Sequence, residues 1–269
     1  MLWNKIIGAG GAGGGDEGWD VSAAVFLQSF NLGAASAALG VSFKPDGTKM
    51  YISDAASKSV IEYNIGTAWD ISTASFSQSV VTTTETSQRG LYISPDGANM
   101  YLVQAQTSRI VRRILSAPWD VVTPVPSTSF TYSGVTTNVT GLFFKPDGTK
   151  MYLINVVGDK VNEYNLSTAW DITTAVFVQG FSYIAAETVP WNIFFKPDGA
   201  KMYLVGSTAD SVYEYDLSVA WNVSTAVFLQ SFSVAAQNTD PRSLFFKPDG
   251  TKMYVVGASI RFAHEYDLG

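Results

Sequence analysis

The nine-residue stretch Phe43-Lys-Pro-Asp-Gly-Thr-Lys-Met-Tyr51 is written five times along the chain. The second copy is Ile93-Ser-Pro-Asp-Gly-Ala-Asn-Met-Tyr101, and the remaining copies occupy 144–152, 195–203 and 246–254. Their prolines stand at 45, 95, 146, 197 and 248, so the period is 50 or 51 residues. A repeat of this length is typical of propellers and solenoids, in which each copy is one supersecondary unit that packs on its neighbours.

Composition favours one globular domain and excludes several classes of function. The 269 residues are 46% hydrophobic, enough for a packed core. A net charge of −6 argues against a nucleic-acid partner, which a basic face would bind. There is no cysteine, hence no disulfide, thiolate nucleophile or zinc knuckle. No apolar run approaches the roughly 18 residues of a membrane span. We therefore predict no metal site, no cofactor, no nucleic-acid partner and no membrane span.

Each repeat reads as four short strands separated by turn residues. In the first copy these strands are 39–43, 50–53, 60–65 and 75–80. Pro45-Asp-Gly47 is a turn signal after the first strand, and a Trp-Asp loop precedes the fourth. β-Branched and aromatic residues dominate, and the spacing of an amphipathic helix is absent. In the second copy Pro124 and Pro126 fall in the fourth strand, which is tolerable only at a sheet edge.

The two ends of the repeat array complement each other. The chain finishes at Glu265-Tyr-Asp-Leu-Gly269, after a third strand, and opens after its first 17 residues with the Trp-Asp loop and fourth strand of 18–30. Pairing these two pieces would close a circle and remove exposed strand edges. Tryptophans recur at 19, 69, 119, 170 and 221. Residues 18–269 are therefore predicted to form an all-β, five-bladed β-propeller with four antiparallel strands per blade, its ring closed when the N-terminal strand completes the C-terminal blade.

Residues 1–17 form a separate Gly-rich arm. A short mixed segment is followed by the glycine-rich run 8–15, without the apolar region or cleavage site of a signal peptide. The arm is either a flexible terminus or a tether. We expect a tether, anchored to a partner through the apolar side chains of Leu2, Trp3, Ile6 and Ile7.

The Pro-Asp-Gly, Lys-Met-Tyr, Glu-Tyr and Ala-Trp-Asp copies resemble the YVTN-type repeat propellers of bacteria and bacteriophages, over residues 18–269. The blade number is similar to that of five-bladed lectins such as tachylectin. The resemblance implies a non-catalytic structural or interaction protein, a virion accessory of the decoration or fibre type. Its arm would bind other virion or assembly proteins and its ring would be displayed outward. The expected location is the virion, or alternatively the bacterial cytoplasm.

Strand alternation divides the loops between two faces. The constant face carries the Pro-Asp-Gly turns and the Trp-Asp loops, which hardly change among the copies. The variable face carries the second-to-third loops and the connections between blades, which differ in every copy. Asp70 on the constant face corresponds to Asn222, so that position needs a hydrogen-bond acceptor and not a titrating carboxylate. Function is expected on the variable face, because loops on a rigid ring change freely.

A ring of residues just before the inner strands is expected around the channel mouth of the variable face: Leu39, Arg89, Thr140, Trp191 and Arg242. Arg89, Trp191 and Arg242, with the nearby amides of Gln104, Asn155 and Asn192, would suit a sugar, which uses an aromatic platform and planar donors. This predicts a carbohydrate-binding propeller, with a host-surface glycan as the candidate partner, as the second hypothesis. The competing interpretation is a set of ordinary solvated loop residues.

Catalysis has weak support. His264, the single histidine, aligns with Ile61, Val111, Asn162 and Tyr213, and no serine is placed opposite it. Variable-face carboxylates could converge as a calcium or acid–base site, as in propeller lyases and lactonases: Asp54, Glu85, Asp159, Glu187, Asp210 and Asp240. A lyase or lactonase is the third hypothesis. The sequence favours a protein that is not an enzyme, with no catalytic residues.

Overall fold

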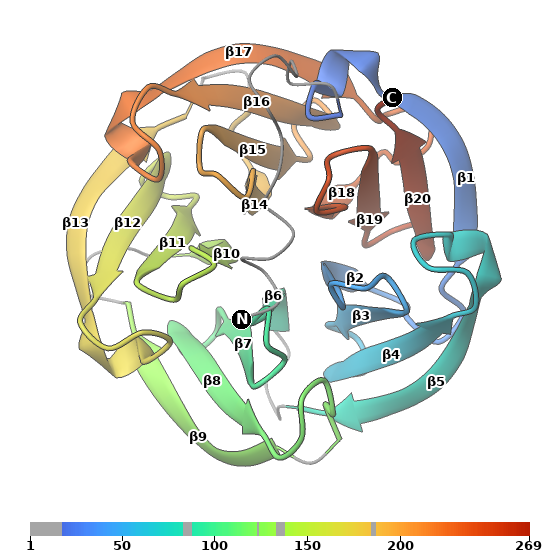
Figure 1. The fold of residues 1–269 in the computed structure, drawn as a ribbon, viewed down its shortest axis with the longest axis horizontal. Coiled ribbons are helices and arrows are strands. Elements are labelled where there is room, and N and C mark those ends of the chain that lie inside the picture. The colour runs from blue at the N-terminus through green and yellow to red at the C-terminus, as the bar shows by residue number, and fades with distance from the viewer. Residues whose placement is uncertain (1–17, 83–87, 123, 133–137, 184–186) are drawn as a thin grey trace, which may run out of the picture.

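The chain folds into a ring of five four-stranded antiparallel sheets around a central axis (Figure 1). The computed structural model describes residues 18–82, 88–122, 124–132, 138–183 and 187–269. In each sheet the strand nearest the axis is followed outward by the next ones in chain order. The five-bladed propeller predicted from the sequence is confirmed.

The first three blades each take four consecutive strands. Blade 1 contains β2 (Ala38–Phe43), β3 (Lys49–Asp54), β4 (Ser59–Ile65) and β5 (Ala74–Val81). Blade 2 contains β6 (Gln88–Ile93), β7 (Asn99–Gln104), β8 (Arg109–Leu115) and β9 (Pro124–Thr131). Blade 3 contains β10 (Val139–Phe144), β11 (Lys150–Asn155), β12 (Lys160–Leu166) and β13 (Ala175–Ser182). The proline-containing β9 is the outermost strand of its sheet, as predicted.

Blade 4 repeats the pattern and blade 5 is assembled from both ends of the chain. Blade 4 contains β14 (Pro190–Phe195), β15 (Lys201–Gly206), β16 (Ser211–Leu217) and β17 (Ala226–Ser233). Blade 5 contains β18 (Pro241–Phe246), β19 (Lys252–Gly257), β20 (Phe262–Asp267) and, outermost, β1 (Val25–Asn31). β1 pairs antiparallel with β20 from Val25↔Asp267 to Asn31↔Phe262, and Figure 1 shows the blue β1 beside the red β20. The predicted closure is confirmed, and the ring has no free edge inside it.

Helical structure in the described ranges is limited to four 3-10 turns, which precede four of the outer strands. They are η1 (Val21–Ala23), η2 (Ile71–Thr73), η3 (Ile172–Thr174) and η4 (Val223–Thr225). Asp70 Oδ1 accepts a hydrogen bond of 3.0 Å from the Ser72 N–H, and Asn222 Oδ1 accepts one of 3.1 Å from Ser224. The shared role of Asp70 and Asn222 as caps confirms that this position requires an acceptor. None of the helical turns in the described part of the chain has the length and apolar character to cross a membrane.

The core lies between the blades. Most side chains of the first three strands of each blade are buried, including all five methionines of the repeats. Each fully buried methionine or phenylalanine contributes about 1.5–3 kcal/mol relative to an exposed one. Aromatic rings of successive blades are in contact: the centroids of Phe43 and Tyr254 are 4.5 Å apart. Blades therefore stabilise one another, as expected of a repeat whose units cannot bury their faces alone.

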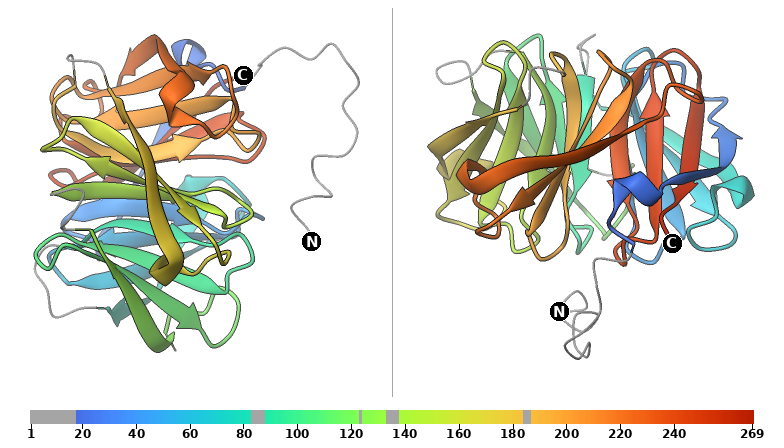
Figure 2. Two further views of the ribbon diagram at one scale, coloured as in Figure 1. Left: turned by 90° about the vertical axis from the view of Figure 1, so that its left-hand side faces the viewer. Right: turned by 90° about the horizontal axis from the view of Figure 1, so that it is seen from above.

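The constant face is held by a recurrent turn-and-loop contact. In the first copy Gly47 has φ +73°, and Asp46 Oδ1 accepts a hydrogen bond of 3.0 Å from the Thr48 N–H. The Trp69 N–H then donates to the Gly47 carbonyl at 3.1 Å. The Pro-Asp-Gly turns and Trp-Asp loops thus lie on one face and are structural, as predicted. Views from the side show the loops gathered at the two ends of a short cylinder (Figure 2).

Candidate functional site

The residues of the predicted mouth ring are set apart by a backbone irregularity. Each inner strand carries a β-bulge near its start; in β18, for example, the pairing passes from Pro241↔Gly257 to Ser243↔Val256 and leaves Arg242 without a partner. The same irregularity falls at Leu39, Trp191, and the positions of Arg89 and Thr140. These residues lie inside the inner strands and not just before them, which corrects the sequence-based placement. A bulge redirects a side chain out of the ladder, and it explains why this position differs from its neighbours.

Three of the ring residues come together across blades 2, 4 and 5. The Cζ atom of Arg242 lies 3.7 Å from the centroid of the Trp191 ring, and that of Arg89 lies 5.2 Å from it. Both distances are within the range of a cation–π contact. The Trp191 indole is oriented by its Nε1–H, which donates to Ser207 Oγ at 2.9 Å. The arginine–tryptophan cluster, Arg89, Trp191 and Arg242, is the candidate functional site.

Both arginine side chains are held in place by contacts with neighbouring residues. Arg242 forms an ion pair with Asp240, and its side chain is 17% exposed. Arg89 donates to the Asn138 side-chain oxygen and, at 3.2 Å, to the Val139 carbonyl. These contacts limit the rotamers of long side chains that would otherwise lose entropy on binding a ligand. The cluster is therefore organised before any ligand arrives.

The cluster concentrates positive charge in a partly dehydrated place. Burial lowers the pKa of the Arg89 guanidinium, and the nearby charge of Arg242 lowers it further. Burial also lowers the pKa of Arg242, whereas its ion pair with Asp240 opposes that change. Arginine stays protonated in proteins, so the consequence is mutual repulsion and not a loss of charge. An anion placed beside both groups would relieve that repulsion.

The other mouth residues play structural parts. Thr140 is 1% exposed, and its hydroxyl donates to the Pro190 carbonyl at 2.8 Å. The Asn155 side-chain oxygen accepts a hydrogen bond of 3.2 Å from the Gly158 N–H inside its own loop. Gln104 is 9% exposed and Asn192 4% exposed, at the end of β7 and within β14. We therefore leave these amides out of the candidate site. Trp191 itself presents no free platform, because the Arg242 guanidinium is stacked on its ring.

Variable-face carboxylates act largely as loop anchors. Asp54, 0% exposed, accepts hydrogen bonds from the backbone N–H groups of Ser36 and Ser57 at 2.9 and 2.8 Å. Glu187, 1% exposed, accepts one of 2.7 Å from Val189. In the described ranges no group of three or more His, Cys, Asp or Glu side chains could hold a metal ion. Glu85 and the arm residues Leu2, Trp3, Ile6 and Ile7 lie outside the described residues, so their predicted roles stay predictions.

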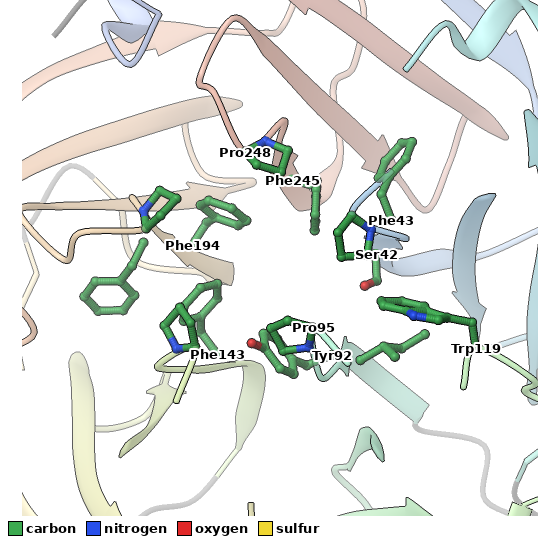
Figure 3. Close-up of a pocket in the computed structure, with 14 residues that line it drawn as sticks. Ser42, Phe43, Tyr92, Pro95, Trp119, Phe143, Phe194, Phe245 and Pro248 are labelled. Atoms are coloured by element: carbon green, nitrogen blue, oxygen red, sulfur yellow. The ribbon is translucent and has the colours of Figure 1, made fainter. Parts of the chain in front are cut away.

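A hollow at the opposite end of the central axis escaped the sequence analysis. It lies inside the ring of the five repeat prolines on the constant face and has a water-accessible volume of about 60 Å³. Ser42, Tyr92, Phe143, Phe194 and Phe245, one residue from each inner strand, line it together with Trp119 (Figure 3). An alignment of the five copies would have shown that Ser42 stands alone among aromatic residues at this position.

Comparison with known proteins supports the fold. No protein-family model matches the sequence, and no curated protein is significantly similar to it. A proposed 6-phosphogluconolactonase of Bacteroides uniformis superposes with a TM-score of 0.50 at 15% identity, covering 83% of this chain and 66% of that one. Hydrazine synthase of Kuenenia stuttgartiensis superposes with a TM-score of 0.50 at 14% identity, covering 83% of this chain and 56% of that one. A proposed 6-phosphogluconolactonase of Bacteroides fragilis superposes with a TM-score of 0.49 at 14% identity, covering 81% of this chain and 63% of that one.

The chain thus spans less than two thirds of the length of these solved chains. At such identities the likeness concerns the propeller fold alone, since one fold carries many functions. None of these comparisons supports the YVTN-type affiliation or the bacteriophage origin, and the virion location stays a prediction.

Proposed function

We propose that this propeller is a non-catalytic binding protein that recognises an acidic sugar, carrying a carboxylate or phosphate, at the channel mouth of its variable face. One observation carries the proposal: two partly buried guanidinium groups, of Arg89 and Arg242, converge on the single indole ring of Trp191. This refines the second sequence-based hypothesis, a carbohydrate-binding propeller, by adding a negative charge to the ligand.

Guanidinium chemistry favours an anionic group. Arginine presents a planar fork of donors that matches a carboxylate or phosphate in two-point contact. The chain as a whole carries a net charge of −6, so long-range attraction would not bring an anion here. The attraction is local and depends on the two positive charges and their partial burial, which strengthens electrostatic contacts. Binding at this mouth would therefore be selective for a ligand that places its charge between the arginines.

The indole gives a reason to expect a sugar ring and not a bare anion. Trp191 is only partly buried, and the edge of its indole ring is apolar surface next to the charged groups. Ligand sites commonly combine such aromatic surface with a few placed polar groups. A sugar acid joins an apolar C–H face to an anionic substituent and can use both. A simple phosphate or acetate would use the arginines only.

Titration calorimetry tests this proposal with matched pairs of sugars: glucuronate against glucose, and glucose 6-phosphate against glucose. The acidic member is expected to bind and the neutral one to bind at least tenfold more weakly. Arg242→Gln and Arg89→Gln should each weaken binding about 10- to 100-fold, the loss of one charge-assisted contact. Arg109→Gln, which removes an exposed arginine of β8, is the matched control and should bind as the wild type does. The proposal would be refuted if both arginine variants bound the acidic sugars as tightly as the wild type does. It would also be refuted if the wild type bound neither acidic sugar.

Lactone hydrolysis is the catalytic alternative. Two structural neighbours are named as proposed 6-phosphogluconolactonases, although the likeness shows only the fold. The same arginines would suit the phosphate of such a substrate. The assay follows hydrolysis of 6-phosphogluconolactone above its spontaneous rate, in the wild type and in Arg242→Gln. A rate enhancement that Arg242→Gln abolishes would replace the binding proposal by an enzymatic one.

Attachment of the ring to a larger assembly is a separate hypothesis, based on the sequence of residues 1–17 alone. Deletion of residues 2–15 should leave the ring folded, as judged by circular dichroism, and should abolish co-sedimentation with the assembly. Retained co-sedimentation would remove the anchoring role of Leu2, Trp3, Ile6 and Ile7.

A further inference from the structure

The tryptophans of the Trp-Asp loops build a repeated aromatic stack on the constant face. In four of the five positions, the tryptophan of one blade packs on an inner-strand aromatic ring of the preceding blade. The pairs and their centroid distances are Trp69–Phe245, 6.3 Å; Trp170–Tyr92, 6.3 Å; Trp221–Phe143, 6.5 Å; and Trp19–Phe194, 6.4 Å. By the same relation the partner of Trp119 is residue 42, which is a serine.

Trp119 lacks a second aromatic neighbour as well. The other four tryptophans each lie 5.5–5.8 Å from the ring of the phenylalanine that ends the inner strand of their own blade: Phe43, Phe144, Phe195 and Phe246. Next to Trp119 that position is Ile93. Among the described residues, the aromatic contact that Trp119 keeps is with Tyr51, 6.0 Å away, which also donates a hydrogen bond of 3.0 Å to the Trp119 carbonyl. The boundary between blades 1 and 2 is therefore short of two rings that every other boundary has.

The missing ring at position 42 leaves space. Trp119 is the tryptophan that lines the constant-face hollow, in which Ser42 and Trp119 lie next to each other (Figure 3). Around the rest of the channel the rings form a collar: Tyr92–Phe143, Phe143–Phe194 and Phe194–Phe245 meet edge to face at 5.2–5.4 Å. The collar is interrupted at Ser42. The volume of the hollow, about 60 Å³, exceeds the roughly 10–15 Å³ that one water needs.

We propose that this hollow binds a single planar aromatic ring, of phenol or indole size, between Ser42 and Trp119. The other blades show what fits there, because four of them place a phenyl or phenol ring at the equivalent position. A bound ring would stack on Trp119 and meet the rings of Tyr92 and Phe245. The Ser42 hydroxyl adds a polar contact, which favours phenol or indole over benzene.

The size of the hollow sets the mode of binding. An enclosed cavity of about 150 Å³ takes up benzene in an engineered protein. The present hollow is smaller and opens to solvent inside the proline rim, so part of the ligand would remain in the channel. Affinity would be modest, with Kd on the order of 0.1–1 mM for a ligand of this size.

Ligand-detected NMR and calorimetry with indole and phenol test the proposal, each measured on the wild type, Ser42→Phe and Ser42→Ala. Ser42→Phe supplies the missing ring and should abolish binding. Ser42→Ala keeps the space and loses the hydroxyl, so it should weaken indole binding severalfold without abolishing it. No binding by the wild type up to the solubility of indole, or unchanged binding by Ser42→Phe, would overturn the proposal.

Two further measurements keep the result interpretable. Phe194→Ser copies the gap beside Trp19 and leaves Trp119, Tyr92 and Phe245 in place, so a folded variant should bind indole at two sites in place of one. A stoichiometry that stays at one in the folded variant would contradict the geometric argument. N-acetyl-tryptophanamide separates the sources of the ring: binding at least as tight as that of indole indicates a side chain of a partner, and much weaker binding indicates a free small molecule.

Discussion

Glu214 in β16 accepts a hydrogen bond of 3.1 Å from the backbone N–H of Val21, a residue 193 positions earlier in the chain. The contact joins blade 4 to the segment that completes blade 5. The same carboxylate, 0% exposed, accepts the Gln230 amide at 2.9 Å and pairs with Lys201 at 2.7 Å. Blades 3 and 5 repeat the arrangement, with Glu163 bonded to the Val223 N–H and Glu265 to the Ile71 N–H. A buried carboxylate thus ties each of these blades to the next.

Glu214→Ala should lower the free energy of unfolding by about 3–5 kcal/mol, because it leaves the Lys201 charge buried without that partner. Asp216→Ala is the matched control, since Asp216 binds the same lysine at 2.9 Å but is 53% exposed. That change should cost less than about 1 kcal/mol. Chemical denaturation of both variants measures the difference, and equal losses would contradict the role assigned to the buried carboxylate.

Replacing His264 should reduce the loss of unfolding free energy that the protein shows between pH 6.5 and pH 4. His264 is 5% exposed, neither ring nitrogen has a hydrogen-bond partner among the described residues, and burial lowers its pKa to about 4. Between pH 6.5 and 4 the unfolded chain binds a proton that the folded chain does not bind. Stability therefore falls as the pH falls through this range, by up to about 3 kcal/mol.

His264→Val, which installs the residue found at the equivalent position 111, should remove this part of the pH dependence. Denaturant unfolding at pH 7 and pH 4.5 gives the comparison. Aspartate and glutamate titration is common to both proteins and cancels in the difference. If the unfolding free energy fell by the same amount between pH 7 and pH 4.5 in the wild type and in the variant, His264 would not be the group responsible.

Gly47→Ala should destabilise the constant face by about 2–4 kcal/mol, because Gly47 has a positive φ and an added Cβ would overlap the Trp69 indole. Gly66→Ala is the control: its nearest neighbour would be Thr73 at 3.5 Å, an ordinary contact. It should change stability by less than about 1 kcal/mol in either direction. The midpoints of thermal unfolding report both effects, and a neutral Gly47→Ala would show that the turn and loop are not packed together.

Asp70→Asn should be nearly neutral at pH 7, whereas Asp70→Ala should cost about 1 kcal/mol. Asp70 caps η2 and accepts a hydrogen bond of 2.7 Å from Gln28 of blade 5, and an amide oxygen performs the same functions at Asn222. Denaturant unfolding of the two variants side by side tests this. A loss on Asp70→Asn as large as that on Asp70→Ala would mean that the charge itself matters.

Much of the architecture was readable from the repeat. The five copies predicted the blade number, and the complementary ends predicted the pairing of β1 with β20. Asp70 and Asn222 were correctly interpreted as acceptors. In the first blade the strand ends were predicted to within one residue: the inner strand begins at Ala38, one residue before the expected Leu39. In blades 4 and 5 the inner strands begin at Pro190 and Pro241, three residues before the expected Ile193 and Leu244. These features follow from local turn chemistry and from strand alternation, and both can be read directly from the order of the residues.

The candidate sites were only partly readable. The sequence predicted five equivalent residues around the mouth, and the structure brings together Arg89, Trp191 and Arg242 and buries Thr140. Nothing in the sequence indicated that Arg242 would lie on the Trp191 ring, because the bulges that aim these side chains depend on strand pairing.

The sequence by itself determined how many blades there are, where each strand turns and how the ring closes, since every blade repeats the same short-range signals. Tertiary structure alone decided which side chains from different blades meet. Ser42 and Trp119 are neighbours because closure of the ring sets the loop of blade 2 against the inner strand of blade 1. Contacts of that kind arise from packing between repeats, so they differ from one boundary to the next even where the local pattern is the same.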